Sequence, residues 1–230
     1  NNEKKGIVPS TTWKRQNLEQ SWYLGETIIT GIGQGYIQST PLQLCLMTAQ
    51  LANGGYKIKP RIIYKNNPNF EEIISKIKNY KPTLHDQNIL NEQDIKLYGK
   101  MYKNSKNIKF VLDAMFGSTN EKYGTSYKSR FEDEKYQYAG KTGTSQVRRI
   151  TDKQRKLDLD TSQIEYKNRD HALFVAFAPY KNPRYSISVL IEHGGSGSKV
   201  AAPLAKKVIK KIIDRHQLRE QIRKGITTLV

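Results

Sequence analysis

With 230 residues the chain is long enough for one domain with a substantial hydrophobic core, and its single cysteine, Cys45, excludes internal disulfides and cysteine-based zinc clusters. No apolar run reaches the roughly 18 residues of a membrane-spanning helix and no signal-peptide pattern is present, so we expect neither feature within these residues. Lysine and arginine outnumber aspartate and glutamate by 39 to 21, a net charge of +18, but they are spread along the whole chain, which favours a solvated surface over a dedicated nucleic-acid site.

The first 30 residues lack a sustained hydrophobic period. Pro9 and Gly25 interrupt them, and we expect residues 1–30 to form a loop that wraps on the domain. The next run, GIGQG at 31–35, predicts a bent, close-packed turn. A dinucleotide-binding fingerprint is disfavoured, because Tyr36 stands where its last glycine would be.

Residues 31–120 are expected to form a mainly helical part of the domain, on the basis of apolar residues at helical spacing. Capping residues before the apolar runs and glycines after them mark the ends of these elements. In chain order, the pattern predicts a helix between Pro41 and Asn53, a strand over 56–63, and helices over 91–104 and 107–119.

The last third of the chain is rich in β-branched and aromatic residues. Three such segments lie within residues 136–193, and the last two are joined by the turn-forming run PYKNP, so we expect antiparallel neighbours in one sheet. Residues 199–226 have the pattern of an amphipathic helix that lies across this sheet. The face predicted to meet the sheet consists of Val200, Leu204, Val208, Ile212 and Ile213.

The run Lys141-Thr142-Gly143-Thr144 is unusual inside a predicted strand. Alternate side chains share a face, so Lys141 and Gly143 point one way while Thr142 and Thr144 point the other. On an edge strand, a ligand would meet an ammonium group, hydroxyls and unpaired backbone groups, with Gly143 leaving room for a close approach. A peptide that ends in a carboxylate fits this description, whereas a glycine-containing bulge with an incidental lysine is the structural alternative.

Several motifs together resemble the penicillin-binding, serine transpeptidase family. KTGT in a first strand, the hairpin HALFVAFAPYKNPRYSISVLIEHGG and a terminal helix resemble the end of that domain. Upstream, WYLGETIITGIGQGYIQSTPLQL followed by ANGG resembles the branch that serves cell elongation in Gram-negative bacteria rather than cell division. The resemblance implies an α/β (α+β) fold of the β-lactamase type. We expect a mostly antiparallel sheet flanked by helices, forming one partial domain over 1–230 that is incomplete at its amino-terminal side.

The family's chemistry gives each residue of the KTGT segment an expected role. A serine of a Ser-x-x-Lys motif attacks the penultimate D-Ala carbonyl of a stem peptide, and a β-lactam imitates that D-Ala-D-Ala end. By the resemblance, Lys141 would hold the substrate carboxylate, and Thr142 and Thr144 would hydrogen-bond to it beside Gly143. The N–H of Thr144 would supply half of the oxyanion hole. No metal or organic cofactor is implied.

The sequence departs from the family at the nucleophile. In the family, the Ser-x-x-Lys and Ser-x-Asn motifs both precede the GIGQG block, and neither occurs before Gly31 here. We therefore expect no catalytic residue in this chain, a nucleophile supplied from upstream, and no acylation by the chain alone. Chance matches occur at Ser75–Lys78, Ser118–Asn120 and Ser196–Lys199; the first two could build a serine site, and the third favours a turn before a helix.

The resemblance also implies partners and a location. The partners would be stem peptides, β-lactams, the nucleophile-bearing half and cell-elongation proteins, with no nucleic acid. The parent protein would be anchored in the inner membrane, with this domain in the periplasm. Two alternatives stay open: a D-Ala-D-Ala carboxypeptidase or β-lactamase that uses the same strand, and a non-catalytic basic module that binds anionic polymers.

Overall fold

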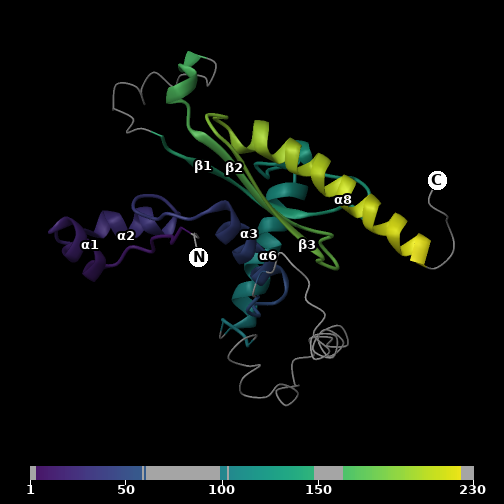
Figure 1. The fold of residues 1–230 in the computed structure, drawn as a ribbon, viewed down its shortest axis with the longest axis horizontal. Helices are drawn as coiled ribbons and strands as arrows, with labels where there is room; N and C mark the ends of the chain where they lie inside the picture. Colours follow the sequence, from purple (N-terminus) through teal and green to yellow (C-terminus); the bar gives the residue numbers. More distant parts are fainter. Residues whose placement is uncertain (1–3, 59, 61–98, 103, 148–162, 224–230) are drawn as a thin grey trace.

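A three-stranded antiparallel sheet is the centre of the fold (Figure 1). The computed structural model describes residues 4–58, 60, 99–102, 104–147 and 163–223. The strands are β1 (Ala139–Ser145), β2 (His171–Ala178) and β3 (Tyr185–Ile191), in the order β1-β2-β3. The predicted antiparallel arrangement of the three segments is therefore confirmed, with β1 and β3 as the two edges.

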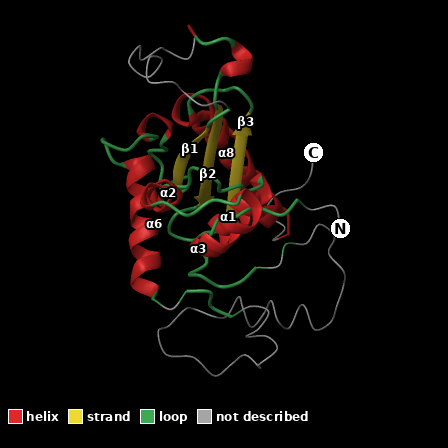
Figure 2. Ribbon diagram, turned by 90° about the vertical axis from the view of Figure 1, so that its left-hand side faces the viewer, coloured by secondary structure: helices red, strands yellow, loops and turns green. Residues whose placement is uncertain are grey.

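The sheet separates two layers of helices (Figure 2). On one face, alternate residues of β2 such as Phe174 pack in a fully buried core against α8 (Ala202–Arg223). On the other face, Phe177 of β2 and Ala139 of β1 pack with Met115 of the helix α6 (Ser105–Asn120). The predicted α/β architecture, with helices flanking a mostly antiparallel sheet, is thus present in the described part of the chain.

The helix α8 and the turn before it meet the sheet through a face that overlaps the predicted one only in part. The buried residues are Ala201, Ala202, Ala205, Ile209 and Ile213, and of these the sequence predicted only Ile213. Of the predicted face, Val200, Leu204 and Val208 are 40%, 42% and 37% exposed. The expectation was wrong on this point because alanines carry little hydrophobic weight in a periodicity argument, yet they allow a helix to approach a sheet closely.

The start of α8 also differs from the predicted helix over 199–226. A π-helical turn, η4 (Gly197–Ala201), precedes α8, and residues 224–226 lie outside the described residues. The side chain of Ser196 caps this turn by accepting a hydrogen bond from the N–H of Lys199 at 3.4 Å.

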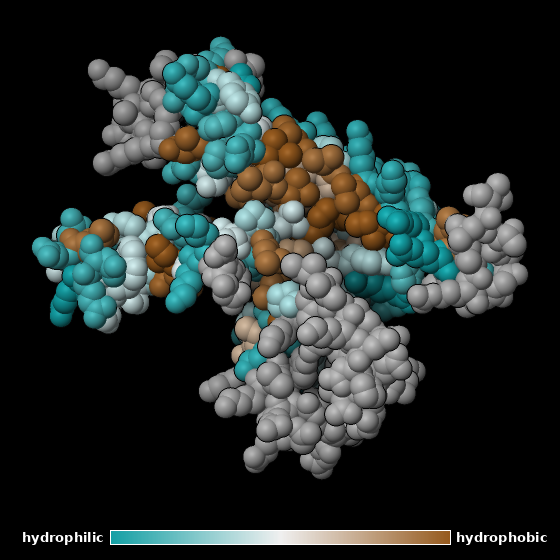
Figure 3. All heavy atoms as spheres, viewed as in Figure 1, coloured by the Kyte–Doolittle hydropathy of each residue, from teal (hydrophilic) through white to brown (hydrophobic). Residues whose placement is uncertain are grey.

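Figure 3 shows hydrophobic side chains gathered over the sheet and the adjoining side of α8.

Two helices cover the opposite face of the sheet, α3 (Pro41–Ala52) and α6 (Ser105–Asn120). The hydroxyl of Thr40 caps α3 by accepting from the N–H of Gln43 at 3.2 Å, and Pro41 occupies the first turn, as the sequence predicts. Asn104 caps α6 in the same way. Between these helices, Tyr56 and Lys100 form an isolated antiparallel bridge.

Other predictions for residues 31–120 have a mixed outcome. The predicted helix over 107–119 is confirmed by α6. The predicted helix over 91–104 is wrong at 99–102, because backbone bonds to Gly55 and Lys57 hold that segment extended. Its residues 91–98 and 103, and most of the predicted strand over 56–63, lie outside the described residues.

Residues 1–30 are not a simple loop. They contain α1 (Thr11–Leu18) and α2 (Leu24–Gly31), which extend to one side of the sheet (Figure 1). The hydroxyl of Ser10 caps α1, and the carboxylate of Glu26 accepts from the N–H of Tyr23 at the start of α2. The expectation of a loop was wrong because these capping contacts outweigh the interruptions by proline and glycine.

Candidate functional site

The four residues of the KTGT segment lie on β1, at an open edge of the sheet. In the register with β2, Lys141 is opposite Val175 and Gly143 is opposite Leu173. Lys141 and Thr144 are exposed, whereas Thr142 and Gly143 are half-buried. In the described part of the chain no strand pairs with the other side of β1, so its backbone groups on that side face outward.

Two backbone carbonyls on this edge are capped by side chains. The ammonium of Lys141 donates to the carbonyl of Thr142, with Nζ and O 2.7 Å apart. The side-chain amide of Gln34 donates to the carbonyl of Thr144, with Nε2 and O 3.2 Å apart. Neither donor belongs to β2, because Lys141 is part of β1 itself and Gln34 lies in the turn after α2, so these two carbonyls point away from β2.

The direction of the carbonyls fixes the direction of the N–H groups. In an antiparallel pair, a residue directs its N–H and its C=O toward the same neighbouring strand. The N–H groups of Thr142 and Thr144 therefore face the open edge together with their capped carbonyls. The edge accordingly presents donors, which is the polarity that a carboxylate or an oxyanion requires.

The glycines of β1 have packing roles. A Cβ at Gly143 would lie 3.2 Å from the Cβ of Leu173, and a Cβ at Gly140 would lie 2.5 Å from Cζ of Phe174. Gly197 of η4 sits against the backbone of Gly143, where a Cβ would lie 2.7 Å from the Gly143 carbonyl oxygen. The space that the sequence suggested for a ligand beside Gly143 is thus partly occupied by the sheet's own side chains.

Hydroxyl groups connect Thr142 to the end of α6. The Thr142 and Thr125 hydroxyl oxygens are 3.3 Å apart, and those of Thr125 and Ser118 are also 3.3 Å apart. Thr119 and Asn120 both donate to the carbonyl of Tyr138, at 2.8 and 2.9 Å, and so anchor the start of β1. Thr125 was missed in the sequence, because no local pattern links it to a strand 17 positions away.

The structure places residues of two of the three chance serine motifs and shows what they contact. Asn120, in the motif that starts at Ser118, is committed to holding the strand. Ser196 caps the turn before α8 and its hydroxyl oxygen lies 3.1 Å from that of Ser198, as expected for a turn before a helix. Ser75 and Lys78 lie outside the described residues.

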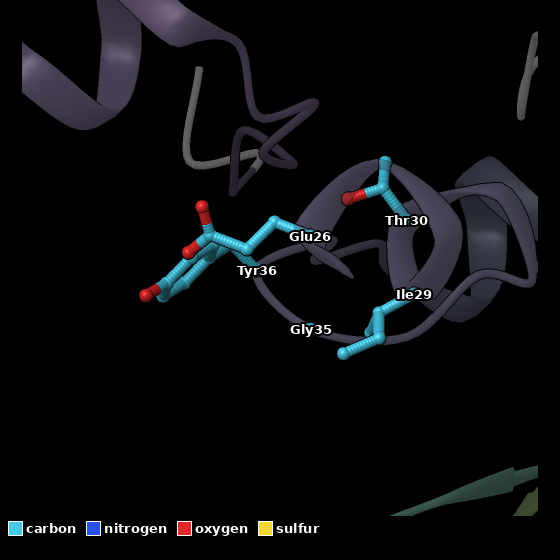
Figure 4. A pocket seen from close by; sticks show the side chains of 5 residues that line it. All are labelled: Glu26, Ile29, Thr30, Gly35 and Tyr36. Carbon is cyan, nitrogen blue, oxygen red and sulfur yellow. The ribbon is translucent and has the colours of Figure 1, made fainter. Parts of the chain in front are cut away.

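The KTGT residues lie along an open strand edge. A hollow of about 210 Å³ lies instead under α2 and the turn after it, lined by Glu26, Ile29, Thr30, Gly35 and Tyr36 (Figure 4). None of the KTGT residues lines this hollow. Among the described residues, no three His, Cys, Asp or Glu side chains are grouped so as to hold a metal ion.

An ion pair fixes the α1–α2 region that carries this hollow. The ammonium of Lys14, which is 1% exposed, lies 2.6 Å from Oε1 of Glu26 and 2.8 Å from the carbonyl of Ser21. The hydrogen bond from Lys14, followed by that from the N–H of Tyr23, holds the pKa of the Glu26 carboxyl below its usual value. The fold of this region therefore stabilises the charged form of Glu26.

Comparison with known proteins identifies the class to which this fold and strand belong. The family model described as the penicillin binding protein transpeptidase domain matches residues 3–210. The chain therefore belongs to the penicillin-binding protein transpeptidase domain family.

None of the helices in the described ranges has the length and apolar character that crossing a bilayer requires.

Individual relatives indicate which branch of the family the chain is similar to. The peptidoglycan D,D-transpeptidase MrdA of Salmonella typhimurium is 34% identical over 214 residues, which are 93% of this chain and 31% of that protein. The enzyme of the same name from Haemophilus influenzae is 33% identical over 205 residues. The chain thus spans about a third of the length of the curated relatives that it matches.

Solved structures agree with the sequence relatives. The complex between penicillin-binding protein 2 (PBP2) and MreC from Helicobacter pylori matches with a TM-score of 0.66 and 31% identity, covering 93% of this chain and 32% of that one. Pseudomonas aeruginosa PBP2 in complex with WCK 5153 matches with a TM-score of 0.64 and 34% identity, covering 91% and 38%. The predicted transpeptidase fold is confirmed by these structures.

Proposed function

We propose that this chain supplies the substrate-binding strand of a peptidoglycan D,D-transpeptidase of the cell-elongation type. The observation that carries the proposal is the donor-rich edge of β1, where an ammonium group, two outward N–H groups and two hydroxyls stand together on Lys141, Thr142 and Thr144. Its ligand is the terminal carboxylate of a D-Ala-D-Ala stem peptide, or the carboxylate of a β-lactam that imitates it. In this proposal, residues 1–230 belong to a single transpeptidase domain.

In this proposal, each residue of the edge has a defined task. Lys141 and the hydroxyls of Thr142 and Thr144 hold the substrate carboxylate, while Gly143 keeps the strand closely packed on Leu173. A serine outside this chain attacks the penultimate carbonyl, and the N–H of Thr144 stabilises the oxyanion that forms. The terminal D-Ala leaves, and the acyl group passes from the serine to an amine of a neighbouring peptide.

The relatives also suggest a setting for the parent protein. The Helicobacter pylori PBP2 structure is a complex with MreC, and the Salmonella relative is named a peptidoglycan D,D-transpeptidase. By analogy, the parent of this chain works in the periplasm beside cell-elongation proteins, anchored in the inner membrane by a segment outside these residues.

An equilibrium binding experiment tests the proposed ligand. We expect the chain to bind benzylpenicillin and an acyl-D-Ala-D-Ala peptide reversibly, and Lys141→Ala to weaken both affinities at least about tenfold, because a charge-assisted hydrogen bond is lost. The matched control is Lys109→Ala, an exposed lysine on α6, which should leave the affinities unchanged. Equal effects of the two substitutions would reject Lys141 as the carboxylate-binding residue.

A further inference from the structure

The turn after α2 is held rigidly by its own backbone. Gly33 and Gly35 adopt positive φ angles of 78° and 76°, which favour glycine. The N–H of Gly33 donates to the carbonyl of Thr30 at 2.9 Å, and the N–H of Gln34 donates to that of Ile29 at 3.0 Å. The turn therefore closes the last carbonyls of α2 and fixes the backbone of Gln34.

Gly35 packs on α2, whereas a Cβ at Gly31 or Gly33 would meet no atom within 4 Å. A Cβ at Gly35 would lie 3.1 Å from Cγ2 of Ile29, so the turn lies directly against the helix that it ends (Figure 4). From this fixed backbone, the side chain of Gln34 reaches across 110 positions of sequence to the carbonyl of Thr144. Gly33 and Gly35 flank Gln34 with positive φ angles, and from this turn the Gln34 side-chain amide reaches the end of β1.

We propose that Gln34 is a positioning residue of the candidate site, which acts on Thr144 and through it on the ligand. By holding the Thr144 carbonyl, its amide fixes the peptide plane between Thr144 and Ser145. Because an extended residue directs its C=O and its N–H to the same side of the strand, this contact also favours the backbone conformation in which the Thr144 N–H faces the open edge. This role deepens the proposed function and rests on it, because the N–H is the expected oxyanion donor.

Amide and carbonyl NMR of the chain without ligand tests the contact directly. Gln34→Glu keeps the shape of the side chain but replaces the donor with a carboxylate at neutral pH. We expect the carbonyl ¹³C resonance of Thr144 to move upfield and hydrogen exchange of the Thr144 N–H to change, while the carbonyl resonance of Thr142, capped by Lys141, stays in place. Gln34→Lys retains a donor and should return the Thr144 resonance toward its original position.

A matched control is Gln38→Glu, an exposed glutamine in the same segment, which should leave both carbonyl resonances unchanged. An unchanged Thr144 carbonyl in Gln34→Glu, or an equal change at Thr142 and Thr144, would overturn the positioning role. With ligand present, Gln34→Glu should weaken benzylpenicillin affinity about two- to tenfold, the worth of one hydrogen bond.

The two proposals fail in different ways. If the Thr144 resonance responds to Gln34→Glu but the chain binds no carboxylate ligand, the contact stands and the proposed function is rejected. If ligand binding depends on Lys141 while Gln34→Glu changes neither the resonance nor the affinity, the proposed function stands and the role of Gln34 is rejected.

Discussion

At the residue scale, two side chains bond to the open edge of β1. Lys141 and Gln34 donate to the carbonyls of Thr142 and Thr144, and the N–H groups of the same two threonines face the same edge. The position of Lys141 to Thr144 on an edge strand could be predicted from the sequence, because glycine within a β-rich run and the KTGT motif are both local signals. The contribution of Gln34 could not, since its contact spans 110 positions.

The ion pair between Lys14 and Glu26 predicts a pH dependence of the α1–α2 region. The pKa of Glu26 is lowered in the folded state, so its stabilisation is present above the ordinary carboxyl pKa and is lost as the pH falls through the lowered value. We expect the amide resonance of Tyr23, whose N–H donates to Glu26, to report this loss in an acid titration.

The control for this titration is Glu26→Gln, which should abolish the transition at Tyr23. Glu19→Gln, at an exposed carboxyl in the same region, should leave the transition in place. A Tyr23 transition that survives in Glu26→Gln would assign the pH dependence to another group.

At the scale of elements, the packing face of α8 depends on alanine. Ala201, Ala202 and Ala205 are fully buried against the sheet, whereas larger residues on the neighbouring face stay exposed. The sequence pattern predicted the helix and its position across the sheet, because amphipathic periodicity is strong. It could not predict the face, because the close approach of helix and sheet is decided by side-chain volume and not by hydrophobicity alone.

Two substitutions on α8 distinguish the two faces. Ala205→Leu should reduce the free energy of unfolding by about 1–3 kcal/mol, because the added methyl groups have no space against the sheet. Leu204→Ala, at the exposed neighbouring position, should change it by about 0.5 kcal/mol or less. Chemical denaturation of both variants measures the difference, and a larger loss in Leu204→Ala would favour the face that the sequence predicted.

In the amino-terminal region, the sequence pattern did not predict two short helices. The helices α1 and α2 were expected to be a loop, because residues 1–30 lack a sustained hydrophobic period and are interrupted by Pro9 and Gly25. Each helix is 8 residues long and depends on caps and on the Lys14–Glu26 pair. Helices this short carry too little periodicity for a pattern to distinguish them from a loop.

At the scale of the whole molecule, the chain corresponds to about a third of each relative's length. The sheet, α3, α6 and α8 match the transpeptidase fold, which the order of motifs in the sequence predicted. The Ser-x-x-Lys and Ser-x-Asn motifs that the family places before the GIGQG block are not found in that position here. We therefore propose a division of roles, in which this chain binds the substrate carboxylate and another segment supplies the serine.

This division predicts that the chain alone forms no acyl-enzyme. Fluorescent penicillin should leave no covalent label on the chain after denaturing electrophoresis, whereas full-length Pseudomonas aeruginosa PBP2 serves as the labelled control. A covalent label that disappears in Ser75→Ala would show that the chain carries its own nucleophile.

The central claim is that the β1 edge binds a carboxylate through its donors, and a ¹⁵N-amide NMR titration with benzylpenicillin tests it most directly. The account predicts that the largest shifts occur at the N–H groups of Thr142 and Thr144 and that Lys141→Ala requires at least about tenfold more ligand to produce them. Shifts that fall elsewhere in the chain, or that persist unchanged in Lys141→Ala, would contradict it.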